Sequence, residues 1–165
     1  AANAAHHSES RHRNGIVVKG IHDVAVRFSK CCSPVPGDEI VGFVTRGRGV
    51  SIHRTDCVNV VNMPESDRTR LIEAEWEDDA VTENGDMYLT EICMYVQNRT
   101  GIILDISKAF MELDIDIKSL QTRVSKQNVA TIRLSFETGS VEQLSHIISK
   151  LKNIESVYAV ERSAG

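Results

Sequence analysis

KCCSPVPGDEIVGFVTRGRGVSIHRTDC, residues 30–57, is the stretch that decides how the first half of the chain is interpreted. Cys31 and Cys32 are adjacent, and His53 and Cys57 follow after one apolar run and a Gly-Arg-Gly turn. Structural zinc is bound tetrahedrally by thiolate and imidazole ligands, which commonly arrive as two pairs. A histidine and a cysteine four residues apart share one face of a helical turn. The spacing therefore predicts a structural zinc site with the ligands Cys31, Cys32, His53 and Cys57.

The adjacent cysteines are the less usual half of such a site, because neighbouring ligands require a sharp bend in the backbone. Residues 33–37 (SPVPG) supply a stiff, turned segment at this place. Three other interpretations remain open. The cysteines can be small buried hydrophobic residues, Cys31 and Cys32 can form a strained vicinal disulfide, or Cys57 can be a nucleophile with His53 as its base.

The composition indicates a globular protein with one ordinary domain or two small ones. The chain has 165 residues, of which 41% are hydrophobic and 25% are charged. No apolar run approaches the roughly 18–20 residues of a membrane span. Residues 1–14 are small and polar, carry no secretory signal, and are predicted to be a disordered linker or a tag remnant. Four cysteines with a metal-like spacing favour a reducing, cytoplasmic location over a disulfide framework.

The charge is distributed unevenly along the chain, whose net charge is −4. Residues 15–62 hold six Lys/Arg against four Asp/Glu, a formal charge of +2. From residue 63 onward, eleven Lys/Arg face eighteen Asp/Glu, a formal charge of −7. Such asymmetry predicts two units with different partners.

Residues 15–77 are predicted to form a small α+β module. The runs 15–23, 39–45, 50–53 and 70–76 have the β-branched or alternating pattern of strands, whereas 24–29 fits a strand edge or a helical turn. Thr55 and Asp56 offer an N-cap for a helical turn that carries Cys57. The apolar core is thin, and a structural zinc can supply roughly 10–16 kcal/mol of apparent folding free energy. The acidic segment 78–86 is the expected linker.

Residues 87–165 show the alternation βαββαβ. Strands are predicted at 87–97, 116–124, 129–137 and 154–162, with Ile132, Leu134 and Phe136 pointing inward. The second helix is expected to start at Ser140, with Gln143 completing a capping box. The predicted fold is a four-stranded antiparallel sheet with both helices on one face. The helical core stripes are Ile103, Ile106, Phe110 and Leu113, then Val141, Leu144, Ile148 and Leu151.

Both units resemble known domains. The second, with N-R-T-G after its first strand, resembles the ferredoxin-like ACT domain, a small regulatory module that binds amino acids. The first, KCCSPVPGDEIVGFVTRGRGVSIHRTDC followed by an E-x-E-W strand end, closely resembles the conserved-cysteine (zinc-finger or ribosome-intersubunit) domain. That domain precedes ACT in long Rel/Spo-type ppGpp synthetase–hydrolases, the enzymes of the stringent response. The resemblance covers residues 15–163.

The resemblance implies a regulatory fragment without activity of its own, lacking the synthetase and hydrolase domains of its parent. It places the family's metal positions on the four predicted zinc ligands. It also implies contact with the ribosome, restraint of distant catalytic domains, pairing with a second ACT domain, and branched-chain amino acids as ligands for some members. The family's effector loop falls on Asn98, Arg99, Thr100, Gly101 and Ile102.

The residues also suggest how such partners would be bound. Lys30, Arg46, Arg48 and Arg54 lie beside the predicted metal site and can contact ribosomal RNA phosphates, although Arg-rich turns are also often simply solvated.

The second unit offers two further binding surfaces. The loop before its first helix can bind an amino-acid carboxylate at the helix N-terminus, with Ile102 and Ile103 around the aliphatic side chain, or it can be an ordinary connection. Leu89, Cys93 and Tyr95 alternate on one sheet face and fit a homodimer surface unless other parts of the chain cover them. A regulatory module of an amino-acid metabolic enzyme is the alternative, which explains the second unit but leaves the cysteines unexplained.

Overall fold

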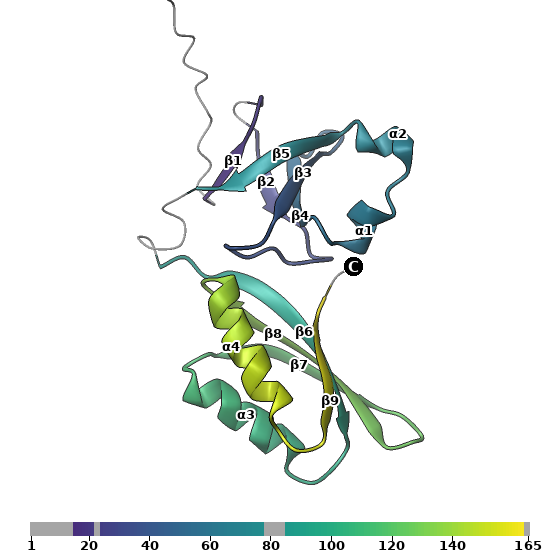
Figure 1. Cartoon of the computed structure of the whole chain (residues 1–165), viewed down its shortest axis with the longest axis vertical. Helices are drawn as coiled ribbons and strands as arrows, with labels where there is room; N and C mark the ends of the chain where they lie inside the picture. The colour runs from purple at the N-terminus through teal and green to yellow at the C-terminus, as the bar shows by residue number, and fades with distance from the viewer. Residues whose placement is uncertain (1–14, 22–23, 78–84, 164–165) are drawn as a thin grey trace, which may run out of the picture.

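The computed structural model describes residues 15–21, 24–77 and 85–163. The predicted linker or tag at 1–14 and most of the predicted linker at 78–86 lie outside these residues. The described chain forms two units, each built on its own sheet, one above the other in Figure 1. No helix among the described residues combines the length and the apolar character needed to cross a bilayer.

The first unit is a five-stranded sheet with two short helices. Its strands follow the order β1-β5-β3-β4-β2, and every neighbouring pair is antiparallel except β2 and β4. The ambiguous run at 24–29 is therefore a strand, while the second short helix was not predicted. The elements are β1 (Ile16–Val18), β2 (Val26–Phe28), β3 (Ile40–Val44), β4 (Val50–Arg54), α1 (Val58–Val61), α2 (Glu65–Arg68) and β5 (Leu71–Trp76).

The core of this unit is small, as its sequence predicts. Gly42 lies at the centre of β3, where an added Cβ would come within 2.9 Å of side chains on both neighbouring strands, Val50 and Ile72. The strands can therefore pack closely only because this position has no side chain. Six residues make up the buried cluster: Ile16, Val18, Val26, Val50, Ile52 and Ala74.

The second unit has the predicted βαββαβ order. Its sheet runs β7-β8-β6-β9 with all pairs antiparallel. Both helices cover the same face of this sheet, and no helix among the described residues covers the other face (Figure 1). The elements are β6 (Tyr88–Gln97), α3 (Ile102–Glu112), β7 (Ile117–Val124), β8 (Val129–Thr138), α4 (Val141–Lys152) and β9 (Val157–Arg162).

The helix stripes differ from the predicted ones by single positions. In α3 the buried residue of the first turn is Ile102, whereas Ile103 is 39% exposed. Ile102 shares a face with Ile106, Ala109 and Phe110 at spacings of three and four, and that face meets the sheet. In α4, Ile147 is fully buried, although the predicted stripe omitted it. Two adjacent apolar residues in a helix leave the buried one undetermined until the sheet is placed.

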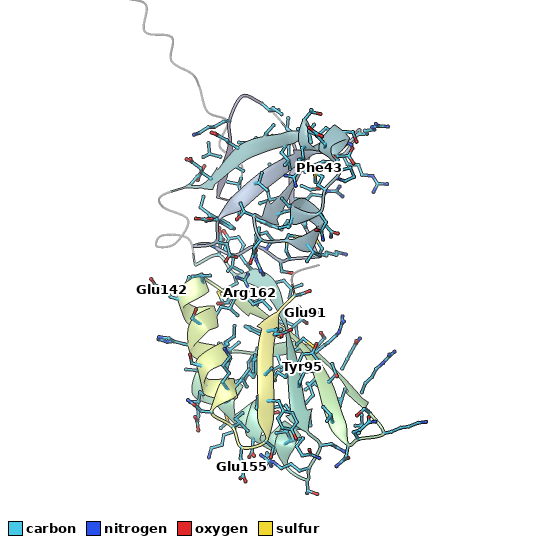
Figure 2. All side chains as sticks on the ribbon, turned by 45° about the vertical axis from the view of Figure 1, so that its right-hand side comes forward. Phe43, Glu91, Tyr95, Glu142, Glu155 and Arg162 are labelled. Atoms are coloured by element: carbon cyan, nitrogen blue, oxygen red, sulfur yellow. The ribbon has the colours of Figure 1, made fainter. Side chains whose placement is uncertain are left out.

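The two units pack directly against each other, and this region of contact is the joint between them. Val35, from the first unit, is fully buried within the core of the second. Phe28 stacks on Trp76 with ring centroids 5.6 Å apart, and Tyr88 meets both rings edge-on. Arg162, at the end of β9, lies at this junction (Figure 2).

Candidate metal centre

The structure brings all four predicted ligands together. The ligand atoms of Cys31, Cys32, His53 and Cys57 lie within 4.8 Å of one another. Cys31 Sγ is 3.4 Å from His53 Nδ1, 3.5 Å from Cys57 Sγ and 3.9 Å from Cys32 Sγ. Zinc bonds of about 2.0–2.3 Å place the corners of a tetrahedron roughly 3.3–3.8 Å apart. The separations from Cys31 lie close to these values, and three thiolates with one imidazole are a donor set that suits one tetrahedral zinc ion, which would draw the wider pairs, up to 4.8 Å apart, closer together.

The backbone route to this cluster differs from the predicted one. His53 lies in strand β4, and Cys57 is the N-cap residue of α1 with an extended conformation (φ −60°, ψ 132°). The prediction of one helical face for the pair, with Thr55 or Asp56 as N-cap, is therefore wrong. A strand, a tight turn and a helix start place the two side chains together. The bend after the Cys-Cys pair is at Ser33, whose φ is +45°.

Burial decides the protonation of these groups without a metal. Cys32 and Cys57 are almost fully buried. Desolvation raises the pKa of both thiols and lowers the pKa of His53. Neutral thiols and a neutral imidazole are therefore favoured, and a metal would displace the thiol protons on binding. A raised thiol pKa also disfavours Cys57 as a nucleophile. The Sγ atoms of Cys31 and Cys32 are not bonded to each other.

Arg54 is a buried residue that is hydrogen-bonded to the Cys/His cluster. Its backbone N–H donates to Cys32 Sγ at 3.3 Å, and its guanidinium forms two 2.9 Å hydrogen bonds with the Asp56 carboxylate. Only 6% of the residue is exposed. The predicted contact of Arg54 with RNA does not fit this burial, because its charge is already paired inside the chain. Hydrogen-bonded groups of this kind orient metal ligands.

The other three predicted RNA-contact residues are exposed. Lys30 precedes the Cys-Cys pair, and Arg46 and Arg48 lie in the turn between β3 and β4. Gly49 closes that turn with φ +80°, and a Cβ there would come within 2.1 Å of the Ala25 carbonyl oxygen. The turn that presents the two arginines thus requires glycine at this position.

The loop before α3 is held mostly by its own chain. Asn98 exchanges hydrogen bonds with Asn128, and Arg99 pairs with Asp105 at 2.7 Å. Gly101 starts the helix with φ +86°. Because Ile102 points into the core and Ile103 points outward, these two side chains do not form one cup, contrary to expectation. Thr100 is exposed.

Sequence reasoning missed the residues that join the two units. Asp38 and Arg162 are 124 positions apart and form a two-bond ion pair at 2.7 and 2.9 Å. Their side chains are only 9% and 16% exposed. No local pattern marks either residue, so only the folded arrangement reveals them.

Comparisons with known proteins match both units. The family model described as the RelA/SpoT RIS domain matches residues 16–77, and the ACT domain model matches residues 84–162. The chain is 40% identical over 148 residues to a GTP pyrophosphokinase of Streptomyces coelicolor, covering 90% of the chain and 17% of that protein. It is 36% identical over 148 residues to the bifunctional (p)ppGpp synthase/hydrolase RelA of Mycobacterium tuberculosis, covering 90% and 19%.

A third relative, the GTP pyrophosphokinase of Escherichia coli K12, is 29% identical over 163 residues, covering 96% of this chain and 21% of that protein. The chain thus spans between 17% and 21% of the length of these relatives. Both matched domains occur in the chain in the order that the sequence predicts. The chain therefore consists of a RIS domain followed by an ACT domain, and it is homologous to the C-terminal regulatory part of RelA/SpoT-type GTP pyrophosphokinases.

Proposed function

We propose that this chain regulates a stringent-response (p)ppGpp synthetase/hydrolase in the cytoplasm, by coupling ribosome, tRNA and amino-acid status to catalytic domains of the same parent. The observation that carries the proposal is the RIS–ACT order, matched over 90% of the chain by GTP pyrophosphokinases. Activity of the parent enzyme in the presence and absence of this chain's two domains tests it. We expect ribosome-dependent control of (p)ppGpp synthesis to disappear without them. Unchanged control would contradict the proposal.

The first part of the proposal is a structural zinc ion at the Cys/His cluster. Three thiols and one imidazole whose ligand atoms lie within 4.8 Å of one another support it. Metal analysis of the chain refolded with zinc should find about one ion per chain, and Cys57→Ser should lose it. Cys93→Ser is the matched control, because Cys93 lies on the sheet of the second unit. Wild-type protein that retains no metal at neutral pH would refute the site.

The second part is contact with ribosomal RNA through the exposed cations Lys30, Arg46 and Arg48. Cations held on a rigid turn bind phosphates with a strong salt dependence. Replacing Arg46 and Arg48 with Glu should weaken co-sedimentation with ribosomes and flatten its dependence on salt. The control is the same double charge reversal at Lys126 and Lys152, which are exposed on the second unit. Equal binding by both double variants would remove the RNA role from this turn.

The third part concerns the ACT domain as a sensor and a dimer. Gly101 opens a helix of eleven residues, whose first amides favour a carboxylate. Because Ile102 is buried, a branched-chain amino acid at this loop would rely on Ile103 and on a second ACT domain. Leu89 and Tyr95 are 58% and 36% exposed on the open sheet face, which supports a homodimer. Calorimetry with valine, leucine and isoleucine tests the ligand, and light scattering tests the dimer. Absence of heat with all three amino acids would leave this loop an ordinary connection.

A further inference from the structure

One short loop, residues 31–38, belongs to the candidate metal centre and also contacts the ACT domain. Its first two residues are the candidate metal ligands Cys31 and Cys32. Its remaining residues face the ACT domain, where Val35 enters the core and the Pro36 carbonyl accepts a hydrogen bond from the Val141 amide at 2.9 Å. An added Cβ on Gly37 would lie 3.1 Å from the Val141 side chain, so the loop lies directly against the start of α4.

The loop ends in a buried ion pair with the last ACT strand. Arg162 forms its paired hydrogen bonds with Asp38 and also donates to the Ser33 carbonyl at 3.3 Å. Asp38 in turn accepts from the Val35 amide at 2.9 Å, which fixes the shape of the loop. Breaking one side of such a pair leaves a buried charge without a partner, so this contact depends strongly on where the loop lies.

The metal-binding end of the loop is tied to the same strand end. The Ser163 hydroxyl donates to the Cys31 carbonyl at 3.3 Å. Arg54 Nη1 lies 3.2 Å from both the Cys32 carbonyl and the Ser163 carbonyl, so one guanidinium bridges a ligand residue and the ACT domain. The position of the ACT strand is therefore linked, through Arg54 and Ser163, to the backbone of both adjacent cysteines.

We propose that the Cys/His cluster controls the joint between the two domains: a bound zinc-type ion fixes residues 31–38 and thereby locks the ACT domain against the RIS domain, and loss of the ion releases it. A metal bound to Cys31 and Cys32 removes the conformational freedom of the first two residues of the loop 31–38. Arg54 is the positioning residue that carries this restraint to Ser163. The inference rests on the metal part of the proposed function.

The Val141 amide reports directly on the joint, because its hydrogen bond crosses from one domain to the other. The Leu144 amide is the internal control, since it bonds to the carbonyl of Ser140, the N-cap residue of α4, and so stays within the ACT domain. Hydrogen exchange of the full chain should be followed with zinc bound and after removal by a chelator, with the metal content measured in both samples. We expect Val141 to exchange at least tenfold faster without zinc, while Leu144 stays within twofold.

Arg54→Lys separates the restraint from metal binding itself. Lysine keeps the positive charge but lacks the planar guanidinium, which can bind two carbonyls and a carboxylate at once. The variant should retain zinc, and its zinc-bound form should already exchange Val141 rapidly. Arg70→Lys is the control, because Arg70 donates to the Val44 carbonyl on β3, away from the joint.

The outcomes distinguish this inference from the proposal beneath it. Wild-type protein that binds no zinc overturns both the metal site and the joint. Zinc that binds without slowing Val141 exchange overturns the joint alone. Equal acceleration of Val141 and Leu144 on zinc removal also overturns it, because the ACT helix itself would then be opening. A zinc-bound Arg54→Lys variant with the slow exchange of the wild type removes Arg54 from the link.

Discussion

Phe136 shows how far a single residue supports the ACT domain. Its ring is fully buried on β8 and meets Phe110 of α3 with centroids 5.0 Å apart at 70°. Phe136→Ala removes this contact and leaves a cavity between sheet and helix. We expect a loss of about 3–5 kcal/mol in the free energy of unfolding, measured in urea.

The matched control for this substitution is Leu104→Ala, because Leu104 is 71% exposed on the outer side of α3. It should change the free energy of unfolding by no more than about 0.5 kcal/mol. A loss below about 1 kcal/mol for Phe136→Ala would show that the helix does not rest on this ring.

Among the elements, α4 has side-chain hydrogen bonds that cap its N-terminus. The Ser140 hydroxyl accepts a hydrogen bond from the Gln143 amide at 3.3 Å, as the capping box predicts. The Gln143 side chain reaches back to the Gly139 amide at 2.9 Å rather than to Ser140 itself. Ser140→Ala leaves the amide at the start of α4 without a partner. Urea unfolding should show a loss of about 1 kcal/mol.

Ser145→Ala is the control on the same helix, since Ser145 is solvent-exposed and lies away from both ends of α4. Alanine is the better helix former there, so the expected change is a slight gain in stability. Equal losses for Ser140→Ala and Ser145→Ala would contradict the capping role.

The two helices are also linked to each other by charge. Lys150 of α4 pairs with Glu112 at the end of α3, and Lys108 lies 4.0 Å from the same carboxylate. The hydrogen bond from Lys150 is the main cause that lowers the pKa of Glu112. The stability that the pair contributes is therefore present above the carboxyl's unfolded pKa and is lost as the pH falls through the lowered value.

Lys150→Met should raise the pKa of the Glu112 carboxyl toward its ordinary value, which an NMR titration of that carboxyl measures directly. Lys108→Met should raise it less, because Lys108 acts only through its more distant charge. A larger shift with Lys108→Met than with Lys150→Met would assign the pairing to the wrong lysine.

At the scale of the whole molecule, the Asp38–Arg162 pair is a largely buried ion pair between the domains, with two hydrogen bonds. Arg162→Met leaves the Asp38 carboxylate buried without its cation, which should cost roughly 3–5 kcal/mol. Adding Asp38→Asn removes the unpaired charge, so the double variant should be less destabilised than the sum of the two single variants. Urea unfolding of all four proteins completes the double-mutant cycle. Strict additivity would mean that the two residues do not interact in solution.

Much of this architecture follows from local pattern. Alternation in β8 predicts that Ile132, Leu134 and Phe136 point inward, and all three are fully buried. Ser140 and Gln143 mark the start of α4 three residues apart. Such features depend on neighbours within a few residues, where the strand and helix periods determine which side chains share a face. Ile102 and Ile103 show the limit, because a helix start with two apolar residues needs the sheet to decide between them.

Part of the candidate metal centre could be predicted from the sequence, and part became visible only in the fold. Residue types and spacing were enough to name Cys31, Cys32, His53 and Cys57, because thiolates and imidazole are the ligands that zinc prefers. The backbone that unites them, with His53 on a strand and Cys57 at a helix start, came from the fold. The role of Arg54 was likewise invisible, since a charged residue in a basic stretch is usually exposed and this one is buried.

The sequence by itself determined the two domains, their order and the chemistry of their cluster, since each depends on residue type and short-range spacing. Only the tertiary structure decided that residues 31–38 join the cluster to the ACT domain, through Val35 in its core and Asp38 against Arg162. The physical reason is that contacts between residues more than a hundred positions apart depend on how two finished surfaces fit, and no local period encodes that fit.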